Sequence, residues 1–400
     1  MSRRWRATVG GPLAEYASGF AEELIVLGYS KSAAKKQMHL LAHLDLWLET
    51  ERHEVRELTA ELVEPLFAIR RHDGRSNLLT TKSLKPFLGF LRRAGVPEPP
   101  TAAPTDPVEV MVDRYRLYLT RERGLVKGTV HFYAHVARLF LSERSVIDAT
   151  DLAGLTAADV IEFTGRVCEG RGLSSARQAV SALRSLLRWL QMEGRTEPGL
   201  AQAVLSAAGW SPNLPRAVEA GQAALLLSSC DRRRALGRRD YAILSLLIRL
   251  GLRGGEVVRL ELDDIDWRRG EILVRGKGRR QDHLPLPADV GEALAGYLKR
   301  GRPQSASRRV FLRHHAPFVG LADTGAIRGV LERACERAEV AYASPHRLRH
   351  TAATEMLRAG APLSEIAQVL RHRSPTTTSL YAKVDDVRLR ELAGRWPGAA

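Results

Sequence analysis

The amino-acid sequence predicts a mainly α-helical protein, with two helical units followed by a third that also contains a small antiparallel β-sheet. Three observations predict this class. Apolar residues recur at helical spacing, proline-rich stretches separate the segments, and an alternating hairpin pattern occurs only in the third segment. The chain has 400 residues, 44% hydrophobic and 26% charged, a composition that supports folded cores and excludes a mainly disordered chain.

Two proline-rich stretches mark the expected domain boundaries. The first runs from Gly95 to Pro107 and the second covers Trp210–Pro215. Such stretches form extended linkers or turns rather than helices. We therefore expect a helical domain at residues 1–95, a linker at 96–107, a second helical domain at 108–206, a linker at 207–220 and a last domain at 221–400.

The first two segments resemble one another. Leu58-Thr59-Ala60 recurs as Leu155-Thr156-Ala157, 97 positions later, and a run of leucine and aromatic residues precedes both Gly95 and Gly194. Repeated landmarks at nearly constant spacing indicate a duplicated unit of four to five helices. Helical bundles also converge on such patterns, so chance similarity is the alternative.

The third segment changes its period along the chain. Helical spacing covers Tyr241–Leu252 and Gly255–Leu260, whereas Glu271–Arg275 and His283–Leu286 alternate around the glycine turn at Gly276-Lys277-Gly278. This pattern predicts a β-hairpin between helices. Helices are expected again from about Asp323. One of them has a full set of boundary signals: an N-cap serine, a proline at the first helical position and a closing glycine, at Ser344, Pro345 and Gly360.

The charge of the chain points to a polyanionic partner. There are 61 Lys and Arg residues against 45 Asp and Glu, a net charge of +16, and only nine of the 61 are lysine. Arginine is a planar, permanently charged donor that suits phosphate oxygens, so nucleic acid is the expected partner. A generally basic, solvated surface is the alternative.

Other sequence features limit where and how the protein acts. No run of about 18 uncharged apolar residues occurs, so we expect no membrane contact. Cys168, Cys230 and Cys335 are too far apart for a disulfide framework or a zinc knuckle. We therefore expect a protein of the reducing cytoplasm that needs no metal and no cofactor.

Groups that can handle a phosphate occur at separate points of the last segment. Arg253 lies where a loop becomes a helix, and Glu256 follows three residues later, where it can orient the arginine. His346 and Arg349 share one face of the capped helix, because they are three residues apart. Further along come Arg371-His372 and, nine residues after the histidine, Tyr381.

In this order and spacing, the motifs resemble those of the tyrosine recombinase (phage integrase) family. The similarity covers nearly all of residues 215–385 and consists of Gly-Leu-Arg-Gly-Gly-Glu, the Gly-Lys-Gly hairpin, His-Arg-Leu-Arg-His, Arg-His and the tyrosine. It implies that Tyr381 is the nucleophile and that Glu256 supports the first arginine. It also implies five assisting catalytic residues: Arg253, Lys277, His346, Arg349 and His372.

The resemblance also implies a function. It indicates a site-specific DNA recombinase or integrase of a mobile element, which cuts and rejoins strands through a 3′-phosphotyrosine intermediate without metal or ATP. Residues 108–206 resemble the family's core-binding domain. The expected partners are double-stranded DNA at recombination sites and further copies of the chain, as a tetramer on paired sites. The tail at Asp386–Trp396 is expected to dock on a neighbouring protomer, and the enzyme to be cytoplasmic and nucleoid-associated.

The chemistry of these residue types agrees with that assignment. A tyrosine can supply a phenolate, although its ordinary pKa of about 10 requires help with deprotonation. Two arginines can hold the non-bridging oxygens of a phosphate. Lys277 is the only lysine between Lys127 and Lys299. Because a lysine can release a proton and an arginine cannot, we expect Lys277 to be the general acid.

The sequence departs from the family pattern in three places. Gly254-Gly255 replaces the usual branched-apolar and serine pair, so we expect a looser helix start there. Arg371 replaces a common glycine, which is expected to alter the helix end and to add a phosphate contact. Residues 1–95 do not resemble the short β-rich arm-binding domain of many integrases, and we expect them to lengthen the DNA footprint or to mediate protomer contacts.

Other interpretations remain open. A type IB topoisomerase uses the same chemistry, and a DNA-binding regulator could keep the fold without catalysis. His346 and His350 could ligate zinc, but no HExxH glutamate and no third ligand are evident. The charged runs Asp231–Arg234 and Arg238–Asp240 are expected to be solvated faces or backbone-phosphate contacts.

Overall fold

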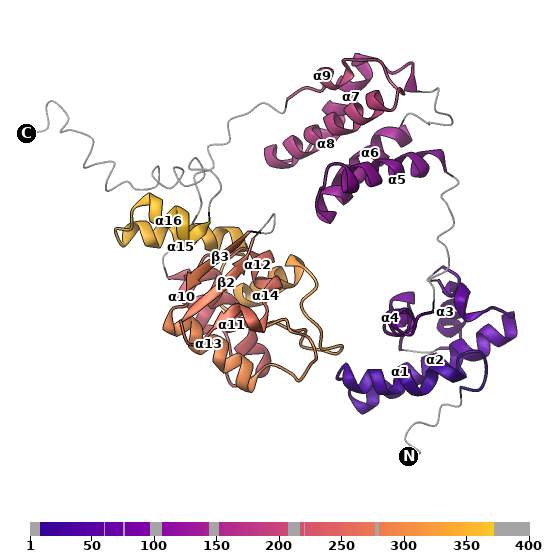
Figure 1. Ribbon diagram of the computed structural model, residues 1–400, viewed down its shortest axis with the longest axis horizontal. Coiled ribbons are helices and arrows are strands. Elements are labelled where there is room, and N and C mark those ends of the chain that lie inside the picture. The colour runs from indigo at the N-terminus through magenta and orange to yellow at the C-terminus, as the bar shows by residue number, and fades with distance from the viewer. Residues whose placement is uncertain are drawn as a thin grey trace, which may run out of the picture. The chain divides into compact units, whose positions relative to one another are not determined.

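The structure is a computed structural model that describes residues 9–59, 61–74, 77–96, 106–143, 152–206, 217–219, 221–276 and 280–371. Its chain contacts define two compact units, one formed by Pro100–Pro212 and the other by the segments on both sides of it. The prediction of a mainly helical protein with one small antiparallel sheet is confirmed (Figure 1). No helix among the described residues is long and apolar enough to cross a membrane.

The unit at Pro100–Pro212 is a small helical bundle. Asp106 caps the first helix by accepting a hydrogen bond from the backbone N–H of Val108, 3.0 Å away, and Pro107 occupies the first turn. The core contains two aromatic pairs, Tyr115 with Trp189 and Phe140 with Phe163. The bundle consists of α5 (Pro107–Arg121), α6 (Lys127–Glu143), α7 (Ala157–Cys168), α8 (Leu173–Met192) and the short α9 (Leu200–Ala203).

Residues 9–96 form helices around a core of their own. Phe20 and Phe87 are fully buried and meet edge to face. The buried carboxylate of Asp45 accepts hydrogen bonds from the backbone N–H groups of Gly10, Gly11 and Leu13. The elements are α1 (Ala14–Val26), α2 (Lys31–Glu51), η1 (Val55–Glu57), α3 (Glu64–His72), η2 (Thr81–Leu84) and α4 (Lys85–Arg93).

The landmarks that repeat in the sequence share some features of local structure, although Thr156 is the N-cap of α7 and Thr59 is followed by a turn before α3. The hydroxyl of Thr59 accepts from the N–H of Leu62, and that of Thr156 accepts from the N–H of Asp159. Gly95 and Gly194 both have positive φ, 82° and 67°, after the end of a helix. Such caps arise wherever these residue types occur, so the duplication stays a prediction.

The remaining described residues, 217–371, pack mainly around α11. Its buried face, which includes Ile243, Leu246 and Leu247, contacts α13 and α15. The sheet has the order β1-β2-β3 and is antiparallel, with Leu273 opposite His283. The elements are α10 (Gln222–Ser228), α11 (Ala235–Arg249), α12 (Gly254–Arg259), η4 (Leu262–Asp264), β1 (Ile265–Asp266), β2 (Glu271–Arg275), β3 (Gln281–Pro285), α13 (Ala288–Arg300), α14 (Thr324–Arg337), α15 (Pro345–Arg358) and α16 (Leu363–Leu370).

Three boundaries differ from the expectation. The helix predicted at Tyr241–Leu252 is α11, which begins six residues earlier. The earlier start was missed because Arg239 and Asp240 were expected on the surface, whereas they are buried as an ion pair within the helix. The helix also ends three residues earlier, because Gly251 has a φ of +56°. Helices resume at α13, before Asp323; Gly291 and Gly296 weaken its helical signal.

Candidate active site

Arg253 is placed by the turn between α11 and α12. At Gly251, a Cβ atom would lie 2.7 Å from Cδ2 of Leu370, so only glycine fits both the backbone conformation and the space. Arg253 is then the N-cap residue of α12. Its backbone N–H and its Nη1 each donate to Glu256, both at 2.8 Å. The side chain of Arg253 remains about half exposed while Glu256 is buried, so the carboxylate orients the arginine and leaves other donors available.

Arg349 lies on α15 and is almost completely buried. Its Nη1 donates to the carbonyl oxygen of Gly251 at 2.6 Å, and its Nη2 donates to that of Leu370. A small apolar cluster between α15 and α16, which includes Ala353 and Ile366, holds the two helices together. Figure 1 shows these helices side by side in yellow. Arg349 thus connects the turn before Arg253 with the end of α16.

His346 is one helical turn before Arg349 on α15. Burial lowers the pKa of His346, and the charges of Arg349 and Arg253 lower it further. The ring of His350 meets the ring of His346 edge to face, with centroids 4.3 Å apart. Burial, followed by His346 and Arg349, lowers the pKa of His350 to about 4. Both imidazoles are therefore neutral at pH 7, and a neutral imidazole offers one donor and one acceptor.

Arg371, which the sequence analysis expected to contact a phosphate, is buried. Its side chain is 4% exposed and its Nη2 lies 2.7 Å from Oε2 of Glu256. The expected phosphate contact is therefore wrong, because this side chain is committed to a buried carboxylate. Sequence reasoning missed this partner. The signal was present in the departure itself, since an arginine at a position that favours glycine needs a compensating interaction.

Of the seven residues predicted for the site, the structure brings together Arg253, Glu256, His346 and Arg349. The others, Lys277, His372 and Tyr381, lie outside the described residues. Described residues adjoin two of them in the sequence: Gly276 and Arg280 flank Lys277, and Arg371 precedes His372. Gly276 donates its N–H to the carbonyl oxygen of Arg280 at 2.8 Å, which closes the hairpin on either side of Lys277.

The described residues contain no group of three or more His, Cys, Asp or Glu side chains that could hold a metal ion. His346 and His350 are neighbours, but no third ligand is found for them in this part of the chain. Their shared neighbour is a cation, Arg349, and a nearby positive charge opposes metal binding. The described site therefore fits an anion rather than a metal.

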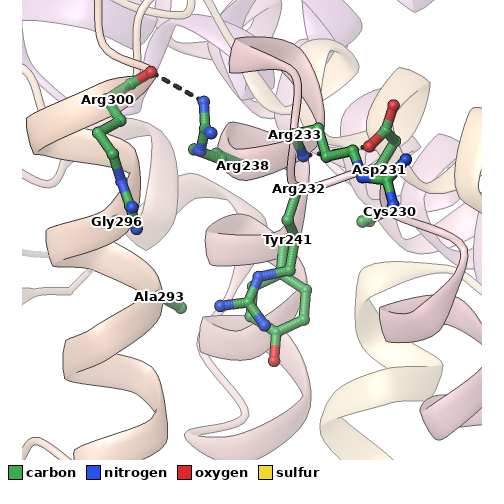
Figure 2. A pocket seen from close by; sticks show the side chains of 9 residues that line it. All are labelled: Cys230, Asp231, Arg232, Arg233, Arg238, Tyr241, Ala293, Gly296 and Arg300. Carbon is green, nitrogen blue, oxygen red and sulfur yellow. Dashed lines mark hydrogen bonds between the residues drawn. The ribbon is translucent and has the colours of Figure 1, made fainter.

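A separate hollow of about 550 Å³ lies at the start of α11 (Figure 2). Arg232 stacks over the ring of Tyr241, 4.4 Å from its centroid. Arg253 follows the other end of the same helix, and 15 helical residues span about 22 Å. The hollow is therefore distinct from the predicted catalytic residues. That Asp231–Arg234 and Arg238 are solvated or contact backbone phosphates stays a prediction, whereas this expectation is wrong for Arg239 and Asp240, which are buried.

Comparison with known proteins identifies the family. The model of the phage integrase family matches residues 216–388, and the model of the phage integrase N-terminal SAM-like domain matches residues 112–194. A putative integrase/recombinase, y4rA, of Sinorhizobium fredii is 40% identical over 98% of this chain and 96% of its own length. The tyrosine recombinase XerD of Mycobacterium tuberculosis is 36% identical over 71% of this chain and 95% of its own length.

Solved structures share the fold. The site-specific recombinase XerH bound to its difH substrate has a TM-score of 0.54 at 20% identity, covering 71% of this chain and 84% of that one. A lambda integrase tetramer bound to a Holliday junction has a TM-score of 0.54 at 17% identity, covering 77% and 87%.

The helical bundle, the α-rich unit with its small sheet and the family matches together define an enzyme of the tyrosine-type DNA strand transferases. The chain belongs to the phage integrase, or tyrosine recombinase, family and is a site-specific recombinase of that family.

Proposed function

We propose that this chain cuts and rejoins double-stranded DNA at specific sites through a covalent 3′-phosphotyrosine bond at Tyr381. The observation that best supports the proposal is that Arg253, at the start of α12, lies near His346 and Arg349 of α15. Both arginines donate to carbonyl oxygens at the end of α16. The next residues along the chain are His372 and, nine positions later, Tyr381. Cations and a neutral imidazole are what a phosphodiester needs around it for attack by a phenolate.

In the proposed reaction, the phenolate oxygen of Tyr381 attacks the scissile phosphorus while the bond to the 5′ oxygen breaks. Arg253, whose side chain is about half exposed, donates to the non-bridging oxygens. Arg349, which is buried on the carbonyl oxygens of Gly251 and Leu370, stabilises the developing charge through its own positive charge. Lys277 gives its proton to the departing oxygen, which leaves as a 5′-hydroxyl. The phosphotyrosine retains the energy of the phosphodiester. Attack by a 5′-hydroxyl of another strand then reverses the step and joins new partners without metal or ATP.

The larger assembly follows from the same proposal. Residues 108–206 act as a core-binding domain, which closes on the duplex with the catalytic domain at 221–400. Several protomers, as a tetramer, assemble on paired sites, and Asp386–Trp396 contacts a neighbour. The relative from Sinorhizobium fredii, which aligns with 98% of this chain, is called a putative integrase/recombinase, and that name supports recombination as the reaction. In this proposal, the chain also serves a mobile element and acts at the nucleoid in the cytoplasm.

One pair of assays tests the proposal. DNA that becomes covalently trapped on the protein is sequenced, and the recovered site is placed on two plasmids. We expect strand exchange between the two sites. Relaxation of supercoils without exchange would indicate a topoisomerase, and unchanged behaviour of a Tyr381→Phe variant would indicate a DNA-binding regulator. That variant should bind the site as tightly as the unmodified protein and form no adduct.

A further inference from the structure

Arg371 is held in an unusual position for an arginine. It is the C-cap residue of α16 and has a left-handed backbone, with φ 55° and ψ 49°. This conformation favours glycine. The side chain is nevertheless buried, and its Nη1 donates to the carbonyl oxygen of Val369 at 2.8 Å. The left-handed backbone and the burial of the charged side chain both cost free energy. A buried cation of this kind needs an oppositely charged partner.

That partner is Glu256, which the arginine shares with Arg253. One carboxylate oxygen, Oε1, accepts from Nη1 of Arg253. The other, Oε2, accepts from the backbone N–H of Arg253 and from Nη2 of Arg371. The loop closes because Nη2 of Arg253 donates to the carbonyl oxygen of Arg371 at 3.5 Å. The three residues thus form one network rather than separate pairs, with Glu256 and Arg371 buried and Arg253 about half exposed.

The network changes the charge available to a phosphate. Burial alone would raise the pKa of Glu256, but Arg371 and then Arg253 hold it below its ordinary value, so the carboxylate stays ionised. A single carboxylate beside Arg253 would cancel the charge of that arginine. With Arg371 as a second cation behind the carboxylate, the network carries a net charge of +1, and the exposed part of it is Arg253.

The network also connects two parts of the proposed site. Arg349 donates to the carbonyl oxygen of Leu370, one residue before Arg371. Arg349 and Arg253 therefore both donate to carbonyl oxygens at the end of α16. In the sequence, His372 and then Tyr381 follow this helix end. Because Glu256 bonds both Arg253 and Arg371, a change at Arg371 is expected to alter the orientation of Arg253.

We propose that Arg371 is a positioning residue for strand cleavage, which keeps Arg253 oriented and positively charged through their shared carboxylate. The role rests on the proposed function, because cleavage is its readout. Arg371 itself does not touch the DNA.

The test compares single-turnover cleavage at saturating DNA, using a nicked duplex that carries the site recovered from trapped DNA. We expect Arg371→Met to slow cleavage about 10-fold with little change in DNA binding, and Arg371→Lys, which keeps the charge, to restore most of the rate. Arg371→Gly suits the left-handed backbone and should be as slow as Arg371→Met, even if it folds more stably. Arg358→Met is the control, since it removes only an exposed ion pair with Glu355 on α15.

A double-variant cycle separates positioning from a merely structural role. If Arg371 acts through Glu256, Arg371→Met should slow a Glu256→Gln protein less than 2-fold further. Additive losses, or wild-type cleavage by both Arg371→Met and Arg371→Gly, would overturn the inference. Absence of any covalent adduct in the unmodified protein would instead overturn the proposed function, so the two failures are distinguishable.

Discussion

Arg349 donates a 2.6 Å hydrogen bond from Nη1 to the carbonyl oxygen of Gly251, and so joins the helix of His346 to the turn that presents Arg253. The two residues are 98 positions apart in the sequence. Because the donor is charged and both groups are buried, the hydrogen bond is strong, and its loss would leave a buried polar group without a partner.

The first prediction concerns Gly251 itself. A Gly251→Ala variant would combine a left-handed φ of +56° with a Cβ only 2.7 Å from Leu370. Gly360→Ala is the matched control, because Gly360 has a φ of +89° and nothing within 4 Å of an added Cβ. We expect about 1 kcal/mol of destabilisation in the control and about 1–3 kcal/mol more in Gly251→Ala, measured by denaturant unfolding. Equal losses would show that the contact with Leu370 is unimportant.

The second concerns pH and His350. Because its pKa in the folded chain is about 4, against 6.5 ordinarily, the unfolded chain takes up a proton that the folded chain refuses. Stability should therefore fall as the pH decreases from about 6.5 to about 4, and level off below that. His350→Leu should make unfolding free energy less dependent on pH over this window. Identical slopes in the two proteins would refute the assignment.

The third concerns the buried ion pairs at the start of α11. Asp240 is 1% exposed and accepts from Arg239 at 2.9 Å and from Arg333 at 3.3 Å. Replacing it by asparagine leaves a buried arginine without its counter-charge, so Asp240→Asn should cost about 3–5 kcal/mol. Asp231→Asn breaks only an exposed pair with Arg234 and should cost less than about 1 kcal/mol. Thermal unfolding of both variants distinguishes the two sites.

The fourth concerns the proposed acid. Lys277→Ala should slow cleavage of ordinary DNA by about 10²–10⁴-fold. A substrate with a sulfur atom at the 5′ bridging position has a leaving group that needs no proton, so it should restore the rate of this variant. The matched control is Arg253→Ala, which affects the non-bridging oxygens and should not be rescued. Failure to rescue Lys277→Ala selectively would show that another group supplies the proton.

The sequence predicted those parts of the structure that depend on local signals. Ser344 is the N-cap and Pro345 the first residue of α15, as predicted. The glycines after Arg275 predicted the hairpin of β2 and β3. The position of Arg253 at the start of α12 was also readable, because Glu256 provides a capping partner within one turn.

The sequence did not predict which charged side chains are buried. Arg239, Asp240 and Arg371 look like surface residues in the sequence, yet each is buried on a partner. Arg371 and Glu256 are 115 positions apart. Only the packing of α12 near the end of α16 decides which carboxylate meets which cation, and no local periodicity encodes such a long-range pairing.

The central claim is that Tyr381 becomes covalently joined to DNA beside Arg253 and Arg349. The most direct measurement is mass spectrometry of the protein after reaction with a suicide duplex, followed by digestion to locate the modified peptide. We expect the added mass of a 3′-phosphorylated nucleotide on Tyr381 and its absence in Tyr381→Phe. An adduct on another residue, or cleavage by Tyr381→Phe at the wild-type rate, would contradict the account.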